Sequence, residues 1–132
     1  MKAIAIIEKG YEGRYHAYSY NLKTMIIGEG NTAKEAKEDF LNTAKEITEC
    51  YTEESVPKEL KNLSFEFRYD MSSFFGIFDF INMTKLAKQV GISDSLMRRY
   101  KIGEYISARQ ISKIETALHQ IGCELANIKL KV

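Results

Sequence analysis

Residues 83–102 read MTKLAKQVGISDSLMRRYKI, and this stretch decides the fold of the second half of the chain. Gly91 divides it into two helical patterns, because glycine readily ends a helix and enters a tight turn with positive φ. Ser93 then stands where its hydroxyl can cap the second helix. Together these features predict a helix-turn-helix, with a plain helical hairpin that binds no ligand as the alternative. Apolar residues recur where the two helices must pack against each other, at Leu86, Ala87, Val90, Ile92, Met97 and Tyr100.

The polar residues of the second helix indicate what such a pair of helices would contact. In a helix-turn-helix, the N-terminal part of the second helix meets base edges in the major groove of DNA. We therefore predict base contacts from Asp94, Ser95 and Arg98, with Arg98 suited to a guanine edge. Residues toward the end of the motif are better placed for phosphates, and a solvated surface position is the ordinary alternative for each basic residue. The candidate DNA-binding residues are Lys85, Ser93, Asp94, Ser95, Arg98, Arg99, Lys101 and Tyr105.

Further helices are predicted on both sides of this stretch. Ser107 with Gln110 forms a capping-box pattern, and apolar residues at steps of three and four predict a closing helix that ends at Gly122. Residues 124–131 follow as a strand or a dimer contact, and the pattern does not decide between the two. Before the stretch, residues 71–80 (MSSFFGIFDF) predict a short helix that feeds the same apolar core.

The first half of the chain contains strand patterns. Residues 2–8 (KAIAIIE) are apolar at five consecutive positions, which favours a central strand buried on both faces. Residues 14–20 are rich in aromatic side chains and predict a second strand, and residues 24–28 predict a short third one. Residues 63–68 alternate between apolar and polar, which predicts a fourth strand with one wet face.

One helix is predicted between the third and the fourth strand. Thr32 with Glu35 is a capping box that starts a helix of about twenty residues with one apolar side. The order β-β-β-α-β predicts an α+β protein, in which residues 1–70 form a small antiparallel sheet with one packed helix. Residues 71–132 are predicted to form a separate all-α domain.

The net charge of the chain hides an asymmetry between its halves. Residues 1–70 carry 10 Lys and Arg against 13 Asp and Glu, a net charge of −3. Residues 71–132 carry 9 against 5, a net charge of +4, so the 132-residue chain as a whole stands at +1. A mildly acidic half joined to a basic half indicates two units with different partners.

Composition also excludes several classes of protein. No apolar run approaches the roughly 18–20 residues that a membrane-spanning helix needs, and the apolar run near the start is too short for a secretory signal. Cys50 and Cys123 lie far apart without metal-binding spacing, and they predict reduced thiols in a cytoplasmic chain. We expect no cofactor, no metal and no membrane partner.

Catalytic chemistry is not predicted, and no catalytic residue is assigned. Two-metal nucleases need clustered carboxylates, whereas the strands supply only Glu8, Glu66 and Asp70, and the helix acids alternate with lysines as on a solvated face. His16 lies in a strand among tyrosines, with no nucleophile or orienting partner near it in the sequence. We therefore expect that the chain is not an enzyme.

With these elements placed, the chain resembles the HicB family of antitoxins from bacterial type II toxin–antitoxin systems. One resemblance lies in AIAIIEKGYEGRYHAYSY followed by GNTAKEAKEDFLNTAKEITE, which looks like the truncated RNase H-like domain of that family. The other lies in TKLAKQVGISDSLMRRYKIGEYISARQISKIETAL, which is similar to the XRE-type helix-turn-helix that many members append. The resemblance implies a toxin-binding domain in residues 1–70 and a DNA-binding domain in residues 71–132.

The resemblance also implies a function. The first domain would bind and mask a small HicA-like ribonuclease toxin that cuts mRNA. The second would bind operator DNA and repress its own operon, as a homodimer or higher homo-oligomer. Two alternatives stay open: a stand-alone helix-turn-helix transcription regulator whose first domain dimerises or senses a small ligand, and a residual RNA-binding or nuclease domain tethered to DNA.

Overall fold

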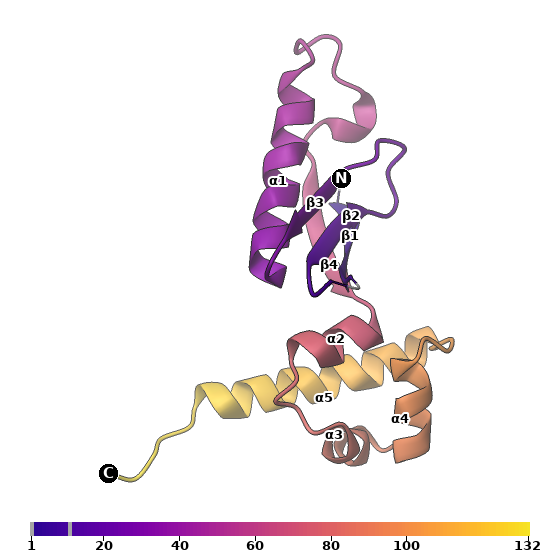
Figure 1. Cartoon of the computed structure of the whole chain (residues 1–132), viewed down its shortest axis with the longest axis vertical. Coiled ribbons are helices and arrows are strands. Elements are labelled where there is room, and N and C mark those ends of the chain that lie inside the picture. Colours follow the sequence, from indigo (N-terminus) through magenta and orange to yellow (C-terminus); the bar gives the residue numbers. More distant parts are fainter. Residues whose placement is uncertain (1, 11) are drawn as a thin grey trace. The chain divides into compact units, whose positions relative to one another are not determined.

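The computed structural model describes residues 2–10 and 12–132 of the chain (Figure 1). The protein is α+β, and it divides into two compact units, Met1–Ile77 and Phe78–Val132. Within the described residues, the first unit holds a four-stranded sheet and the second unit is helical.

The first unit follows the predicted order of three strands, a helix and a fourth strand. The sheet has the strand order β3-β2-β1-β4, so the first strand is central as predicted. The elements are β1 (Lys2–Lys9), β2 (Tyr15–Ser19), β3 (Ile27–Gly30), α1 (Ala33–Glu49), the 3-10 helix η1 (Lys58–Leu60), β4 (Ser64–Tyr69) and α2 (Met71–Ile77).

The sheet is mixed, which corrects the antiparallel sheet predicted from the sequence. β2 pairs antiparallel with both β1 and β3, but β4 pairs parallel with β1. The reason lies in the connection, because α1 joins β3 to β4 and a helical crossover is how a chain joins two parallel strands of one sheet. β2 is antiparallel to both of its neighbours, so β3 runs in the same direction as β1. The crossover keeps that direction, and β4 therefore runs parallel to β1.

The core of this unit lies between α1 and one face of the sheet (Figure 1). Ala5 and Ile7 alternate along β1 and are fully buried against the apolar side of α1. Phe40 of α1 is fully buried too, and its ring packs edge-on against the rings of Phe65 and Phe67 in β4, with centroids 4.8 and 5.7 Å away. The aromatic cluster therefore joins the helix to the strand that follows it.

β3 passes so close to α1 that no side chain fits between them. A Cβ atom on Gly28 would lie 2.2 Å from the backbone nitrogen of Phe40, far inside van der Waals contact. Glycine is required here by the approach of two backbones, as at other places where a strand interior carries glycine. The close contact fixes the distance between α1 and this edge of the sheet.

β3 begins at Ile27, later than the predicted strand at residues 24–28. The backbone amide of Thr24 donates to a carboxylate oxygen of Glu59 at 3.0 Å, so it does not contribute to the sheet. The Thr24 hydroxyl donates to the same oxygen at 2.7 Å, and these bonds lower the pKa of the Glu59 carboxyl. A side chain from η1 thus captures the segment that the sequence pattern assigned to the strand.

Two further details of the first unit differ from the prediction. The second face of β1 is not fully buried, because Ile4 and Ile6 remain half-exposed. At the start of α1, Thr32 accepts the amide of Glu35 at 3.1 Å as predicted, but the Glu35 carboxylate accepts the amide of Asn31 at 2.7 Å rather than that of Thr32. Both side chains therefore cap the start of α1, but the bond to Glu35 comes from the residue before Thr32 rather than from Thr32 itself.

α2 packs on the sheet, although the sequence pattern suggested that it feeds the helical core. The Ser73 hydroxyl accepts the backbone amide of Lys9 at 2.9 Å and so ties α2 to the end of β1. Asp70 accepts the amide of Ser73 at 3.4 Å, at the first turn of the helix. The compact units accordingly divide after Ile77, whereas the sequence pattern placed the change of domain after Asp70.

The second unit contains α3 (Met83–Val90), α4 (Asp94–Lys101) and α5 (Ala108–Ala126). Gly91 ends α3 with a φ of 90°, the left-handed conformation predicted for it. Val90 and Ile92, which were also expected in the core, are only half-buried. The buried apolar residues of this unit are Leu86, Ala87, Met97, Tyr100, Ile114 and Ala117.

The ends of α5 correct two predictions. Ser107 accepts the amide of Gln110 at 3.2 Å, but the return bond of a capping box is missing, because Oε1 of Gln110 is buried without a hydrogen-bond partner in the described part of the chain. The helix does not end at Gly122 but continues to Ala126, with Asn127 as its C-cap. Gly122 does not have the positive φ with which a glycine ends a helix, so it lies within α5. The exposed residues after Asn127 form no strand within the described chain.

Candidate nucleic-acid interface

The candidate DNA-binding residues are arranged around α4. The Ser93 hydroxyl accepts the backbone amide of Leu96 at 3.1 Å, so the helix is capped as predicted. Met97 and Tyr100 lie one turn apart and are buried in the second unit. Because these two side chains occupy the inner side of α4, its polar side chains are left on the exposed side.

One chain of polar contacts joins α3 to the exposed side of α4. Oγ1 of Thr84 donates to Oδ1 of Asp94 at 2.7 Å, and Oδ2 of Asp94 pairs with Nε of Arg98 at 2.9 Å. Asp94 and Arg98 are four residues apart, so their side chains share one side of the helix. The Arg98 side chain is 64% exposed in this arrangement. The carboxylate therefore holds a guanidinium in place without burying it.

A second arginine of α4 is held by the loop that follows the helix. Nε of Arg99 donates to Oε2 of Glu104 at 2.6 Å, and the backbone amide of Glu104 donates to the carbonyl of Arg99 at 3.1 Å. Lys101 is exposed at the end of the helix, and Tyr105 in the loop is 87% exposed. The two arginines thus differ in their supports, because Arg98 is held from within α4 and Arg99 from the loop.

The remaining candidates lie near the starts of α3 and α4. Ser95 is exposed, and its hydroxyl lies 3.3 Å from that of Ser93. Lys85 is exposed in the first turn of α3, where its backbone amide donates to the side chain of Asn82 at 2.9 Å. Ser93 and Ser95 lie at the start of α4, which is the part of the helix that was predicted to meet bases.

The α3–α4 pair and its following loop carry an excess of positive charge. Arg98 and Arg99 are paired with the two acidic residues of this segment, Asp94 and Glu104, so three lysines supply the net charge. An exposed helix with such an excess attracts a polyanion, and the attraction weakens as salt is added. The lysines are Lys85, Lys88 and Lys101.

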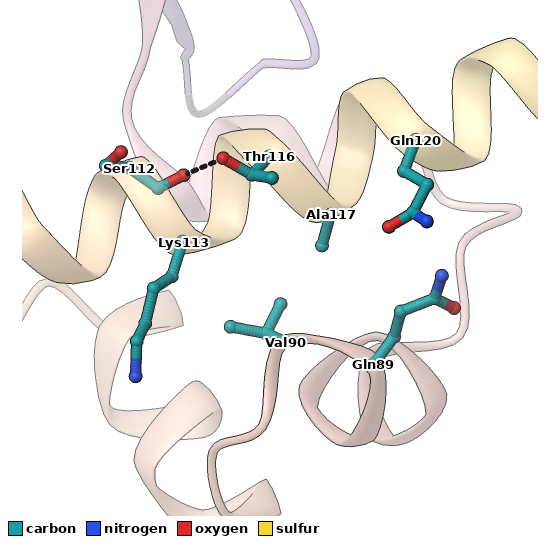
Figure 2. A pocket seen from close by; sticks show the side chains of 7 residues that line it. All are labelled: Gln89, Val90, Ser112, Lys113, Thr116, Ala117 and Gln120. Carbon is teal, nitrogen blue, oxygen red and sulfur yellow. Dashed lines mark hydrogen bonds between the residues drawn. The ribbon is translucent and has the colours of Figure 1, made fainter.

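A shallow groove of about 280 Å³ lies between the end of α3 and α5 (Figure 2). Figure 2 shows the amides of Gln89 and Gln120 reaching toward one another across it, with Val90 and Ala117 facing each other beside them. Its only ionisable lining residue is Lys113, and its other lining residues are uncharged. The groove therefore has no pair of acid and base groups, and its position on α3 and α5 is separate from the exposed residues of α4.

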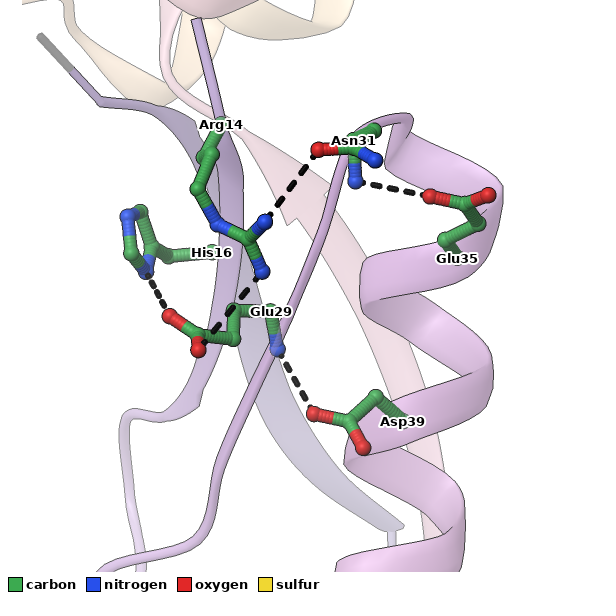
Figure 3. A network of polar contacts seen from close by, with 6 residues as sticks. All are labelled: Arg14, His16, Glu29, Asn31, Glu35 and Asp39. Carbon is green, nitrogen blue, oxygen red and sulfur yellow. Dashed lines mark hydrogen bonds and ion pairs between the residues drawn. The ribbon is translucent and has the colours of Figure 1, made fainter. Parts of the chain in front are cut away.

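A polar network lies in the first unit, where β2, β3 and the start of α1 meet (Figure 3). The Glu29 carboxylate lies 3.6 Å from Nη2 of Arg14 and 3.8 Å from Nδ1 of His16. The backbone amide of Glu29 donates to the Asp39 carboxylate at 2.9 Å. Arg14 also donates to the side-chain oxygen of Asn31 at 3.2 Å. The polar groups of this region thus hold one another and the adjacent backbone, which fastens β3 to α1 and β2.

The face of the sheet opposite α1, which we name the open face, carries apolar and aromatic side chains. The strand register sets Ile6 beside Tyr18, and Tyr18 beside Ile27, in one row across three strands. The Tyr18 hydroxyl donates to Glu8 at 2.7 Å, and burial together with this hydrogen bond raises the pKa of Tyr18 to about 12. Ile27 is 53% exposed, so an apolar part of this row is accessible.

Among residues 2–10 and 12–132, no three His, Cys, Asp or Glu side chains come together as a possible metal site. Over the same residues, no helix is both long and apolar enough to span a bilayer. Cys50 and Cys123 are exposed free thiols.

Sequence reasoning missed two residues that support the arginines of α4. Thr84 lies ten positions before Asp94, and no periodicity links a residue of one helix to the start of the next. Glu104 follows α4 in a loop whose path depends on Gly103, which has a φ of 103°. The pair of Asp94 with Arg98 could have been predicted, because opposite charges four residues apart on a helix often interact.

Comparisons with protein-family models, with curated proteins and with solved structures find no match to this chain. We therefore infer its function from its own residues and their contacts.

Proposed function

We propose that the chain is an antitoxin of the HicB type, which represses its own operon through DNA binding and masks a small HicA-like ribonuclease. One observation carries the DNA-binding half of this proposal. In the α3–α4 pair, a left-handed Gly91 and an N-capping Ser93 join two short helices, and the second helix exposes a row of polar and basic side chains. This is the arrangement by which a helix-turn-helix inserts its second helix into the major groove.

In this proposal, the exposed residues of α4 divide into two roles. Asp94, Ser95 and Arg98 lie in the part of the helix that reads base edges, and an arginine paired with guanine O6 and N7 is the commonest specific contact. Arg99, Lys101 and Tyr105 lie toward the helix end and its loop, where side chains meet phosphates. Lys85 and Ser93, at the starts of α3 and α4, would complete the contact with the backbone of the DNA.

The first unit would bind the toxin. Support for this comes from its β-β-β-α-β order, which matches the truncated RNase H-like domain expected from the resemblance. Its net charge of −3 suits a partner that is basic because it binds RNA. The open face adds apolar and aromatic side chains, among them the exposed Ile27 and its neighbour Tyr18, and aromatic residues are enriched in protein interfaces.

A homodimer in the cytoplasm is the proposed working form. One α3–α4 pair reads only a short stretch of DNA, and helix-turn-helix proteins usually bind two half-sites about 34 Å apart or a multiple of that distance. Three apolar residues at the end of α5 and just after it are exposed and available for a contact between two copies, namely Leu125, Ile128 and Leu130. Ultracentrifugation of the full chain measures the oligomeric state directly.

The DNA-binding proposal is tested by replacing the two arginines of α4 separately. The DNA is the duplex that the wild-type chain enriches from a randomised library. Arg98→Ala is expected to cost about 1–3 kcal/mol on this duplex and to relax the base preference at one position. Arg99→Ala is expected to weaken binding to the selected duplex and to random duplex alike, and to reduce the salt slope by about one unit. Titrations at several salt concentrations measure both effects.

Each arginine variant serves as the control for the other, because both remove one cation from the same helix. Equal losses on selected and random DNA for both variants would exclude the base-reading role of Arg98. If the library yields no enriched sequence for the wild-type chain, the proposal of specific DNA binding is wrong.

The antitoxin proposal is tested by co-expressing the chain with the product of the adjacent gene. We expect a small ribonuclease to co-purify and to lose its RNA-cleaving activity in the complex. Ile27→Asp should reduce capture at least tenfold, because it places a charge in the exposed apolar row of the open face. Leu41→Asp is the matched control, since Leu41 is also half-exposed but lies on α1. Specific DNA binding without any ribonuclease partner would favour a stand-alone transcription regulator instead.

A further inference from the structure

We infer that Asp94 is a positioning residue for DNA reading, which holds Arg98 in the orientation that recognises a guanine. This inference rests on the proposed DNA-binding function and changes one part of it, because Asp94 would hold the base-reading arginine rather than contact a base itself. The observation behind it is the contact chain from Thr84 of α3 through Asp94 to Arg98, with distances of 2.7 and 2.9 Å. Oδ1 of Asp94 binds Thr84, and Oδ2 of Asp94 binds Arg98.

The contact engages Arg98 in a particular way. Asp94 pairs with Nε, the nitrogen nearest to the aliphatic stem of the arginine. An arginine recognises guanine O6 and N7 through two nitrogens in parallel. With Nε occupied, the two terminal nitrogens Nη1 and Nη2 are the pair that remains for the base. The carboxylate therefore selects an end-on approach of the guanidinium to the guanine.

Thr84 makes this support more rigid than an ordinary surface ion pair. Isolated ion pairs at exposed positions contribute little, because both long side chains must be ordered to form them. Here the carboxylate is also held by a hydroxyl from a different helix, so its position is fixed before the arginine joins it. A guanidinium that is ordered in advance loses less conformational freedom when it binds a base.

Asp94 also affects the affinity for DNA that lacks the selected sequence. Non-specific affinity comes from cations that neutralise phosphates, and a free arginine at this position would be one of them. A carboxylate beside Arg98 opposes that use of the side chain, because it repels phosphate and retains Nε. Asp94 should therefore lower affinity for random DNA while raising it for the correct base, and both effects increase the ratio of the two affinities.

The chain contains a matched pair for comparison. Glu104 also binds the Nε of its arginine, Arg99, but it does so from the loop after α4. If carboxylate support in itself made an arginine selective, Glu104 and Asp94 would act alike. Because Arg99 is assigned to phosphates, removing the charge of Glu104 should strengthen binding to every sequence equally.

The experiment measures Asp94→Asn, Thr84→Val and Glu104→Gln in the full chain, on the duplex selected by the wild-type chain and on a random duplex. For Asp94→Asn we expect the ratio of the two affinities to fall about tenfold, with random binding strengthened and the guanine preference lost at one position. Thr84→Val keeps the carboxylate charge and removes its support, so it should lower the ratio about threefold. Glu104→Gln should strengthen both affinities and leave the ratio unchanged.

The outcomes separate this inference from the proposed function. A wild-type chain that does not prefer its selected duplex would overturn both. A wild-type preference that Asp94→Asn leaves unchanged, or that Glu104→Gln lowers equally, would overturn the role of Asp94 alone. Thermal unfolding of each variant checks that α4 remains folded, and if Asp94→Asn unfolds, the ratio measured for Thr84→Val decides.

Discussion

We expect Phe40→Ala to lower the free energy of unfolding of the first unit by about 3–5 kcal/mol, which is the usual cost of emptying a buried phenylalanine site. Phe40 is fully buried, and its ring meets those of Phe65 and Phe67 edge-on. Such aromatic pairs add about 0.5–1.5 kcal/mol beyond the burial of their area. The truncation therefore removes the contact through which α1 is joined to β4.

The cavity left by this change cannot readily be filled. The backbone of α1 already touches β3 at Gly28, so the helix cannot move toward that edge of the sheet. Ala36 and Ala44 on the same side of α1 are too short to reach into the vacated space. A domain of this size has a total stability of only about 4–11 kcal/mol, so the loss is a large part of it.

Amide hydrogen exchange, followed peptide by peptide, measures the loss in each unit separately. In Phe40→Ala, the strands β1 and β2 should exchange about two to four powers of ten faster, while α3, α4 and α5 keep their protection. Binding to the selected DNA should persist, and capture of the ribonuclease should be lost. Leu41→Ala is the control, because Leu41 follows Phe40 on the same helix but is half-exposed. Equal effects of the two substitutions would contradict the assignment of Phe40 as the centre of the core.

The parts of the fold that the sequence predicted well are those set by short-range chemistry. Gly91 and Ser93 lie between α3 and α4, and their turn and cap depend on the residues within a few positions of them. Thr32 likewise caps α1 through a bond to Glu35, three residues away. The alternation of Phe65 and Phe67 with polar neighbours predicted β4 correctly, because the period of a strand is visible in any window that contains it.

The parts that the sequence did not predict depend on contacts between distant residues. Glu59 captures the amide of Thr24, and this bond between residues 35 positions apart delays the start of β3. The parallel pairing of β4 with β1 depends on the path of a whole helix rather than on the residues of either strand. At the candidate site, the spacing of Asp94 and Arg98 in the sequence allows their pairing to be expected, but the hydroxyl of Thr84 that supports them comes from another helix.

Met97→Ala is expected to have the corresponding effect on the second unit, with a loss of about 2–5 kcal/mol in its free energy of unfolding. Met97 is fully buried on the inner side of α4, in a unit that also buries Leu86 and Ile114. A unit of about 55 residues has a stability of only about 3–8 kcal/mol, so the expected loss is a large part of it. Met97→Leu should cost less than about 1.5 kcal/mol, because it nearly conserves volume and shape.

DNA binding distinguishes a variant that unfolds the second unit from a variant that removes one contact with DNA. In Met97→Ala, affinity for selected and random DNA should fall by the same factor, because the folded fraction limits both, and hydrogen exchange in α3 and α4 should accelerate. Arg98→Ala should instead change the ratio of the two affinities and leave exchange unaltered, since its side chain is exposed. Ribonuclease capture should survive both substitutions, because the first unit has a hydrophobic core of its own. If Met97→Ala kept full DNA affinity although α3 and α4 had lost their protection against exchange, DNA binding would have to be assigned to another surface.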